Sequence, residues 1–353
     1  MSLEWEITAD ITGAARAGLV LRVTGARRPA WRWEAARNRL RLVVGDEPRL
    51  WARSDLSWWD PPWFAHRADG PLPPVIPPIL ASDLRAIRHT PRGEGWWRTW
   101  ALRFAEALGA SACSPLHEGT WRLARLDTGS IERAMAWGYL PGQGVPFAHS
   151  VGTMHSGWGV WRSVHERSGQ GEVVLLRRLE ARDVGRIKVW RRRALEGTLP
   201  PVVVAYCAPL GLHLVLDGHA RLCGAVEAGV EPPLMVLFPV RESRTPWRDE
   251  SREQALRDAA SDLEMLAPLG PAGIDIVNRA LIHAFDERVG YTPITRAWPL
   301  VGGVERWTRD IEQATAHLRD EATRTLRDEM LELPRPGGSV RSSNRQRVRA
   351  STS

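Results

Sequence analysis

Hydrophobic and polar residues follow regular periods over much of this chain, and these periods predict its first elements. Apolar and polar residues alternate at Leu19–Thr24 and Arg39–Val44, which predicts strands because successive side chains of a strand point to opposite faces. From Gly95 to Leu108, apolar residues recur every three or four positions, as on one face of a helix. The proline-rich run Pro71–Pro78 predicts an extended connector of the polyproline type.

In the middle of the chain, the apolar run Leu212–Leu216 predicts a strand. The amphipathic run Leu222–Ala228 that follows, closed by Gly229, predicts a short helix.

Helical periods dominate the later part of the chain. Ser251 and Gln254 have the spacing of a capping box and predict a helix that reaches Leu266. Further helices are expected over Ile274–Phe285 and Val304–Leu331. In the last helix one apolar stripe runs among charged residues, and we expect it to pack within the chain, with a partner helix as the alternative. The stripe consists of Trp307, Ile311, Ala314, Leu318, Ala322, Leu326 and Met330.

The pentapeptide Asp217-Gly218-His219-Ala220-Arg221 joins an expected strand to an expected helix. At a helix N-terminus, backbone N–H groups without partners and the helix dipole attract anions. Gly218 allows close approach of a ligand, and Arg221 can hold phosphate oxygens by two hydrogen bonds. His219 can donate a hydrogen bond or relay a proton, and Asp217 can act as a base or hold Mg²⁺. These residue types in this order predict a phosphate site.

This stretch, together with the order of elements around it, resembles the ParB/sulfiredoxin-like superfamily, in which a strand ends in an Asp-Gly-His-x-Arg turn and a helix follows. The resemblance covers about residues 171–240 and implies further elements around the motif. These are an opening strand at Leu175–Glu180, a helix at Asp183–Leu195 and strands at Pro201–Tyr206 and Pro233–Val240. The resemblance implies an α/β core that binds a nucleotide, ATP or CTP, together with Mg²⁺ where phosphate is transferred. By the same resemblance, Gly218, His219 and Arg221 would contact the nucleotide.

The resemblance also implies catalytic residues, because relatives that phosphorylate small molecules use the acidic residue and the histidine of the motif around the nucleotide. Here those residues are Asp217 and His219. Glu180, at the end of the expected opening strand, is where a second carboxylate can approach. An ATP-dependent phosphotransferase that acts on an unidentified small molecule is the enzyme implied.

The motif departs from its relatives at two positions. His219 stands where sulfiredoxin-like enzymes carry a cysteine, so their chemistry on sulfinic acids is not expected here. Partition proteins carry Gly-Glu-Arg-Arg, which Gly218 and Arg221 match and the two residues between them do not. Ala220 replaces a polar residue of many active relatives, which counts against triphosphate binding and catalysis.

Other interpretations of the motif stay open from the sequence alone. In a structural interpretation, Asp217 caps the helix, Arg221 pairs with Glu227 or another surface acid, and His219 is a loop residue. The chain would then be a non-catalytic interaction module with a degenerate core, or a ParB-like protein associated with DNA.

A zinc site is a further alternative at the motif. His213, Asp217, His219 and Cys223 lie within eleven residues and all can ligate zinc. The paired spacings typical of zinc sites are absent, however, and no metal site is predicted.

Charge and composition narrow the classes of partner. The 353 residues carry a formal charge of +7, and residues 334–353 contribute five arginines and no acid, which leaves 7 − 5 = +2 for the other 333 residues. Such a body is weak evidence for a DNA-binding face, whereas the tail can contact nucleic acid weakly and without sequence preference. The sequence contains no apolar run of about 18 residues, so we expect a cytoplasmic protein without a membrane contact.

These observations predict an α+β protein of five segments. A Trp-rich α+β domain at 1–137 is followed by a Gly/aromatic linker at 138–170 and the ParB/sulfiredoxin-like core at 171–240. A helical region at 241–333 and a disordered basic tail at 334–353 complete the chain.

Overall fold

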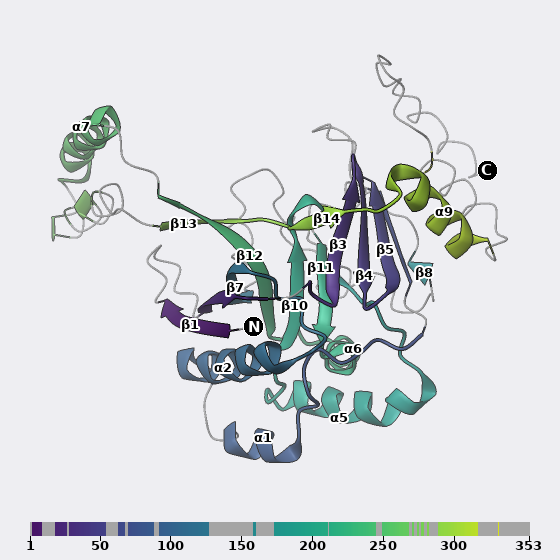
Figure 1. Cartoon of the computed structure of the whole chain (residues 1–353). Coiled ribbons are helices and arrows are strands. Elements are labelled where there is room, and N and C mark those ends of the chain that lie inside the picture. The colour runs from purple at the N-terminus through teal and green to yellow at the C-terminus, as the bar shows by residue number, and fades with distance from the viewer. Residues whose placement is uncertain are drawn as a thin grey trace, which may run out of the picture.

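The structure is a computed structural model, and it describes an α+β protein with two sheets and helices packed on them (Figure 1). The described residues are 2–8, 18–26, 28–53, 63–67, 70–87, 92–126, 158–159, 173–210, 212–244, 249–267 and 289–316, with single positions at 270, 271, 274, 277, 278, 281 and 331. Most of the expected linker, the expected tail and large parts of the last two expected helices lie outside these residues. None of the described helices is both long and apolar enough to cross a bilayer.

The larger sheet has eight strands and unites the N-terminal part of the chain with the expected core. β7 pairs antiparallel with β12, from Thr120 opposite Val240 to Leu126 opposite Leu234. The expected N-terminal domain and the expected core therefore share one sheet and one apolar core. In sheet order the strands are β1 (Ser2–Thr8), β2 (Gly18–Thr24), β7 (Gly119–Leu126), β12 (Leu234–Arg244), β10 (Val202–Cys207), β11 (Leu212–Asp217) and β9 (Val173–Val174), while β13 (Val289–Pro293) pairs with β12.

The expected opening strand is wrong in its extent. β9 contains Val173 and Val174 alone, and Leu175–Glu180 is irregular. The reason is a capping box: the backbone N–H of Glu180 donates to the carboxylate of Asp183, which turns the chain into the short 3-10 helix η2 (Ala181–Asp183).

The smaller sheet has six strands and carries a helix at its end. Its order is β14 (Ala297–Pro299), β3 (Trp31–Ala36), β4 (Arg39–Val44), β5 (Glu47–Arg53), β6 (Trp63–Arg67) and β8 (Trp158–Gly159). The helix α9 (Gly303–Thr315) buries Trp307 and Ile311 on this sheet, and the Trp307 indole donates to the Leu40 carbonyl over 2.9 Å. The described part of the C-terminal stripe thus packs within the chain.

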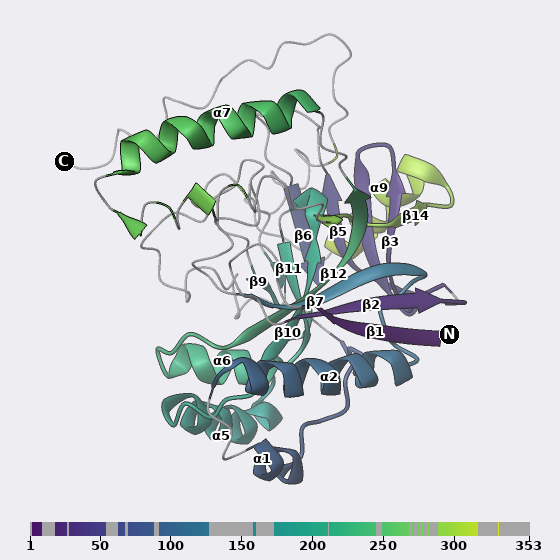
Figure 2. The ribbon, with the colours of Figure 1, turned by 90° about the vertical axis from the view of Figure 1, so that its left-hand side faces the viewer.

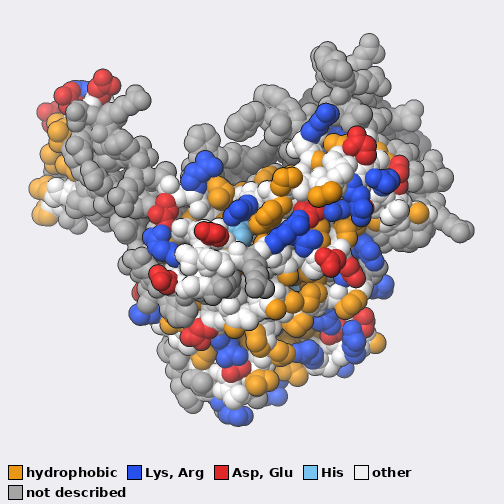
Figure 3. All heavy atoms as spheres, viewed as in Figure 1, with side chains coloured by type: hydrophobic (Ala, Val, Ile, Leu, Met, Phe, Trp, Pro, Cys, Tyr) orange, Lys and Arg blue, Asp and Glu red, His pale blue; other side chains and the backbone are white. Residues whose placement is uncertain are grey.

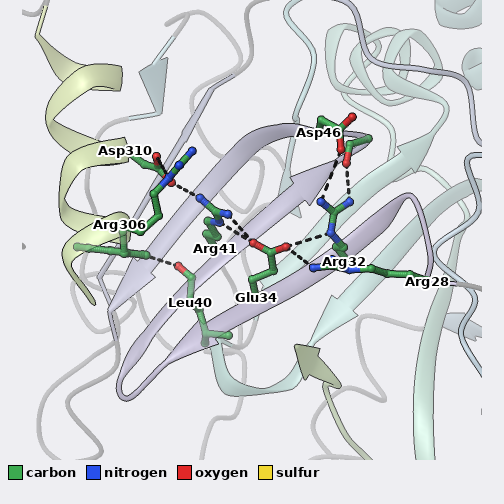
Figure 4. A network of polar contacts seen from close by, with 10 residues as sticks. Arg28, Arg32, Glu34, Leu40, Arg41, Asp46, Arg306 and Asp310 are labelled. Carbon is green, nitrogen blue, oxygen red and sulfur yellow. Dashed lines mark hydrogen bonds and ion pairs between the residues drawn. The ribbon is translucent and has the colours of Figure 1, made fainter. Parts of the chain in front are cut away.

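A network of charges also fixes α9 to the smaller sheet (Figure 4). Buried Glu34 lies between the guanidinium groups of Arg28, Arg32 and Arg41. Arg41 also pairs with Asp310 of α9. Burial acts to raise the pKa of Glu34, but the arginines outweigh it and lower the pKa. Breaking one member would leave buried charge without compensation, so the network positions α9.

Helices cover one side of the larger sheet (Figures 1 and 2). α2 (Glu94–Ala110) buries Trp96, Trp97, Trp100 and Phe104, so tryptophans of the N-terminal part form core. α1 (Ala81–Ile87), α5 (Val184–Leu195) and α6 (His219–Glu227) lie on the same side, and the short η3 (Ala208–Leu210) follows β10.

The helix α7 (Asp249–Leu266) stands apart from this layer in both views. The predicted helix is present and ends at Leu266 as expected, but it begins two residues before Ser251, so the predicted cap at Ser251 is wrong. Asp249 and Glu250 explain the earlier start, because acidic residues in a first turn interact favourably with the helix dipole.

Candidate anion-binding site at the start of α6

Gly218 makes the turn between β11 and α6. Its backbone lies in the left-handed region, with φ 96° and ψ 24°, which favours glycine. A Cβ at this position would also lie 2.8 Å from Nη2 of Arg221. Both the backbone conformation and the close approach of Arg221 therefore require glycine here.

Arg221 points back into the protein. It is 4 % exposed, its Nη2 donates to Oδ2 of Asp217 over 2.5 Å and to the Pro201 carbonyl over 3.1 Å, and its guanidinium lies 5.8 Å from the centre of the Trp190 ring. The acid that pairs with Arg221 is Asp217, and not Glu227. Arg221 thus ties the first turn of α6 to β10 and α5.

His219 is buried at the first position of α6, so it is not a loop residue. It is 7 % exposed, and its Nε2 has no hydrogen-bond partner among the described residues. Burial lowers the pKa of the imidazole to about 4, so the ring is neutral at pH 7. A neutral imidazole has one donor and one acceptor nitrogen, so Nε2 can serve a ligand in either role.

Arg177 and Asp183 form a second layer near His219. Nη2 of Arg177 donates to both carboxylate oxygens of Asp183, over 2.8 and 2.7 Å. Burial acts to raise the pKa of Asp183, but the backbone N–H of Glu180 and the charge of Arg177 outweigh it, and the pKa is lowered. The charges of both residues also act on the pKa of His219. The site was predicted without them, although the three-residue spacing of Glu180 and Asp183 is a signal for the cap.

The side chain of Glu180 points away from the motif, although its predicted role as a second carboxylate requires it to approach the motif. Its side chain is 57 % exposed and pairs with Arg182 over 2.9 Å. Asp217 and Asp183 are the carboxylates whose charges act on the pKa of His219. The structure therefore brings Asp217, Gly218, His219 and Arg221 together and leaves Glu180 at the surface of η2.

The N-terminus of α6 carries no side-chain cap from any described residue. Asp217, the predicted alternative cap, binds Arg221 instead. The first intrahelical bond runs from the Leu222 N–H to the Gly218 carbonyl over 2.8 Å, and the N–H groups before it have no partner within a helix. Backbone donors and a buried imidazole thus occur at one helix start.

The zinc alternative finds no support in the described part of the chain. Among the described residues, there is no group of three or more His, Cys, Asp or Glu side chains that could hold a metal ion. His213 is buried on β11, and its ring lies 5.1 Å from that of Tyr206. Burial raises the pKa of Cys223 to about 12, so its thiol is neutral.

Comparisons of the chain with protein-family models, curated proteins and solved structures found no match. Its function is therefore inferred from the geometry of this site.

Proposed function

We propose that the chain binds a phosphorylated ligand, and in particular a nucleotide such as ATP or CTP, at the N-terminus of α6. The observation that carries this proposal is Nε2 of His219, which is buried at the start of α6. Among the described residues, this atom has no hydrogen-bond partner and no side chain caps the helix. Leaving such an atom unsatisfied costs about 1–3 kcal/mol, and most buried polar atoms have a partner. A phosphate oxygen would accept from Nε2–H and from the first N–H groups of the helix.

Arg221 offers a second donor at the same place. Its Nε is buried and, within the described residues, has no hydrogen-bond partner, although Nη2 is engaged. Glycine at position 218 lets the guanidinium lie this close to the backbone, since a Cβ there would lie 3.0 Å from Nε. A phosphate bound at the start of α6 would meet the imidazole of His219 and, beside it, Nε of Arg221.

Phosphate transfer to a small cytoplasmic molecule is the further step of this proposal. Asp217 would act as the base or as a Mg²⁺ ligand through the oxygen that Arg221 does not bind. Mg²⁺ would supply charge neutralisation at the phosphates. Glu180 lies at the surface, and Arg177 binds both carboxylate oxygens of Asp183, so Asp217 is the carboxylate on which this step depends.

A non-catalytic interaction module is the second candidate, and one observation favours it. Nη2 of Arg221 already binds Asp217 and the Pro201 carbonyl, both within the chain. In this interpretation the motif holds α6 against β10 and has no ligand. The two functions differ in one measurable property, which is nucleotide affinity.

The test is calorimetric titration with ATP, CTP, GTP and ADP, each with and without Mg²⁺. We expect binding by the wild type and a loss of about tenfold or more in His219→Leu, the scale of one hydrogen bond to a charged group. Arg186→Ala, on the exposed side of α5, is the matched control and should bind normally. If the folded wild type binds no nucleotide at millimolar concentration, the interaction module is favoured.

A further inference from the structure

Large apolar side chains are exposed mainly on two helices that carry opposite charge. Eight such side chains are exposed on the described residues, and five of them belong to α5 or α7. They are Val184, Val189 and Leu195 on α5 and Leu256 and Leu263 on α7. An exposed apolar stripe bordered by charge is the usual form of a docking surface.

The exposed face of α5 is basic. The helix contains five basic residues and no acidic one. Val184, Lys188 and Leu195 are spaced to share one row along the helix, and Arg191 borders that row. Lys188 and Arg191 are exposed, and no described residue forms an ion pair with either. This face therefore offers apolar groups between cations.

The exposed face of α7 has the opposite charge. Its sequence contains six acidic and two basic residues, a net charge of −4. Leu256, Ala260 and Leu263 are exposed at the spacing of one helical stripe, and Glu253 and Glu264 border it. Figure 3 shows apolar and acidic side chains on the projecting part at the upper left, where α7 lies.

The two helices are at opposite ends of the molecule in both ribbon views (Figures 1 and 2). α7 of one chain therefore does not contact its own α5. We propose that α7 of one copy docks on α5 of a second copy, with the leucines of α7 against Val184 and Leu195 and the acids against Lys188 and Arg191. A two-fold arrangement makes this contact twice and closes the assembly.

A second copy fits these faces better than a nucleic acid does. A phosphate backbone would satisfy the cations of α5 but would leave its three exposed apolar side chains without a partner. The acidic face of α7 would repel it. The α5 and α7 faces match each other in both charge and apolar character, and every copy of the chain carries both.

Charge reversal tests the contact directly by analytical ultracentrifugation. We expect the wild type to self-associate at low salt and more weakly at 0.5 M NaCl. The pair Lys188→Glu/Arg191→Glu should raise the dissociation constant at least tenfold, and so should Glu253→Arg/Glu264→Arg. Each variant alone places like charges at both contacts. An equimolar mixture of the two restores opposite charges at both, so it should associate as the wild type does.

A zero-length amine-to-carboxylate cross-link gives an independent test, because Lys188 is the sole lysine of the chain. We expect a cross-linked pair of chains in which Lys188 is joined to Glu253 or Glu264. Lys188→Arg keeps the charge and should lose that cross-link while still associating. A wild type that is monomeric at 100 µM in low salt, an association that neither reversal weakens, or a mixture that fails to recover would each overturn the proposal.

Discussion

The close approach of α5 and α6 predicts that one conservative substitution has opposite effects at two glycines. A Cβ at Gly224 of α6 would lie 2.6 Å from the backbone nitrogen of Arg191 and 2.9 Å from the carbonyl oxygen of Ile187. Both atoms belong to the backbone of α5, so no rotamer change relieves the overlap. A Cβ at Gly185 of α5 would have nothing within 4 Å. Gly185→Ala is therefore a matched control.

The expected magnitudes follow from two competing terms. Replacing glycine by alanine inside a helix stabilises it by about 0.8–1 kcal/mol, and overpacking a core costs about 1–3 kcal/mol. Gly224 is buried, and a Cβ there would lie less than 3.0 Å from the backbone of α5, closer than Cβ atoms come to other heavy atoms in proteins. The cost of overpacking should therefore lie in the upper part of its range. We expect Gly224→Ala to lower the free energy of unfolding by about 2 kcal/mol. Gly185→Ala should raise it by up to about 1 kcal/mol.

Urea denaturation followed by tryptophan fluorescence measures both changes through the midpoint concentration. The slope of each transition should stay that of the wild type, since neither substitution alters the surface exposed on unfolding. If Gly224→Ala is as stable as Gly185→Ala, the helices are not packed backbone to backbone and the geometry around the motif is misjudged. Nucleotide affinity should fall in Gly224→Ala alone, because α6 positions His219.

Four further predictions concern the motif, pH and the tail. Arg221→Ala should weaken nucleotide binding by about 1.5–3 kcal/mol, and unchanged affinity would count against the site. Asp217→Asn should still bind nucleotide but stop turnover in a phosphotransferase, and unchanged turnover would count against the role of Asp217. Burial lowers the pKa of both His66 and His219 to about 4. The free energy of unfolding should therefore fall as the pH is lowered from 6.5 to 4, by about 3 kcal/mol for each residue. In His219→Leu, acid titration should show a smaller loss. Deletion of residues 334–353 should abolish weak DNA binding in fluorescence anisotropy at low salt without a change in melting temperature; selective binding that survives would favour the DNA-associated alternative.

The local pattern of apolar and polar residues was sufficient to predict strands and helices that bury one face. The strand predicted at Arg39–Val44 has these bounds in the structure, and the helix predicted at Gly95–Leu108 differs by one or two residues at each end. In the helix the buried positions are the apolar ones, whereas in the strand Arg39 is buried as well and Leu40 only partly so. The pairing of β7 with β12 joins residues more than 100 positions apart, and no local period encodes such a contact.

At the motif, the sequence indicated the turn and the helix but not the directions of the side chains. Arg221 follows Asp217 by four positions, a spacing at which side chains on one helix face meet, and this could have predicted their ion pair. Glu180 was expected at a strand end, and the capping box with Asp183 places it elsewhere. Burial of His219 depends on how α6 packs on the sheet, which the pentapeptide does not determine.

The ion pair between Arg221 and Asp217 sets how a ligand can bind. A phosphate that engages Arg221 competes with a carboxylate that lies 2.5 Å from Nη2, so much of the energy of that contact is an exchange between two anions. His219 is different, because its Nε2 gives up no partner among the described residues when a ligand arrives. The change in affinity in His219→Leu should therefore report the ligand contact alone, whereas the change in Arg221→Ala also includes the broken ion pair with Asp217. For this reason His219→Leu is the more decisive of the two substitutions for the proposed site.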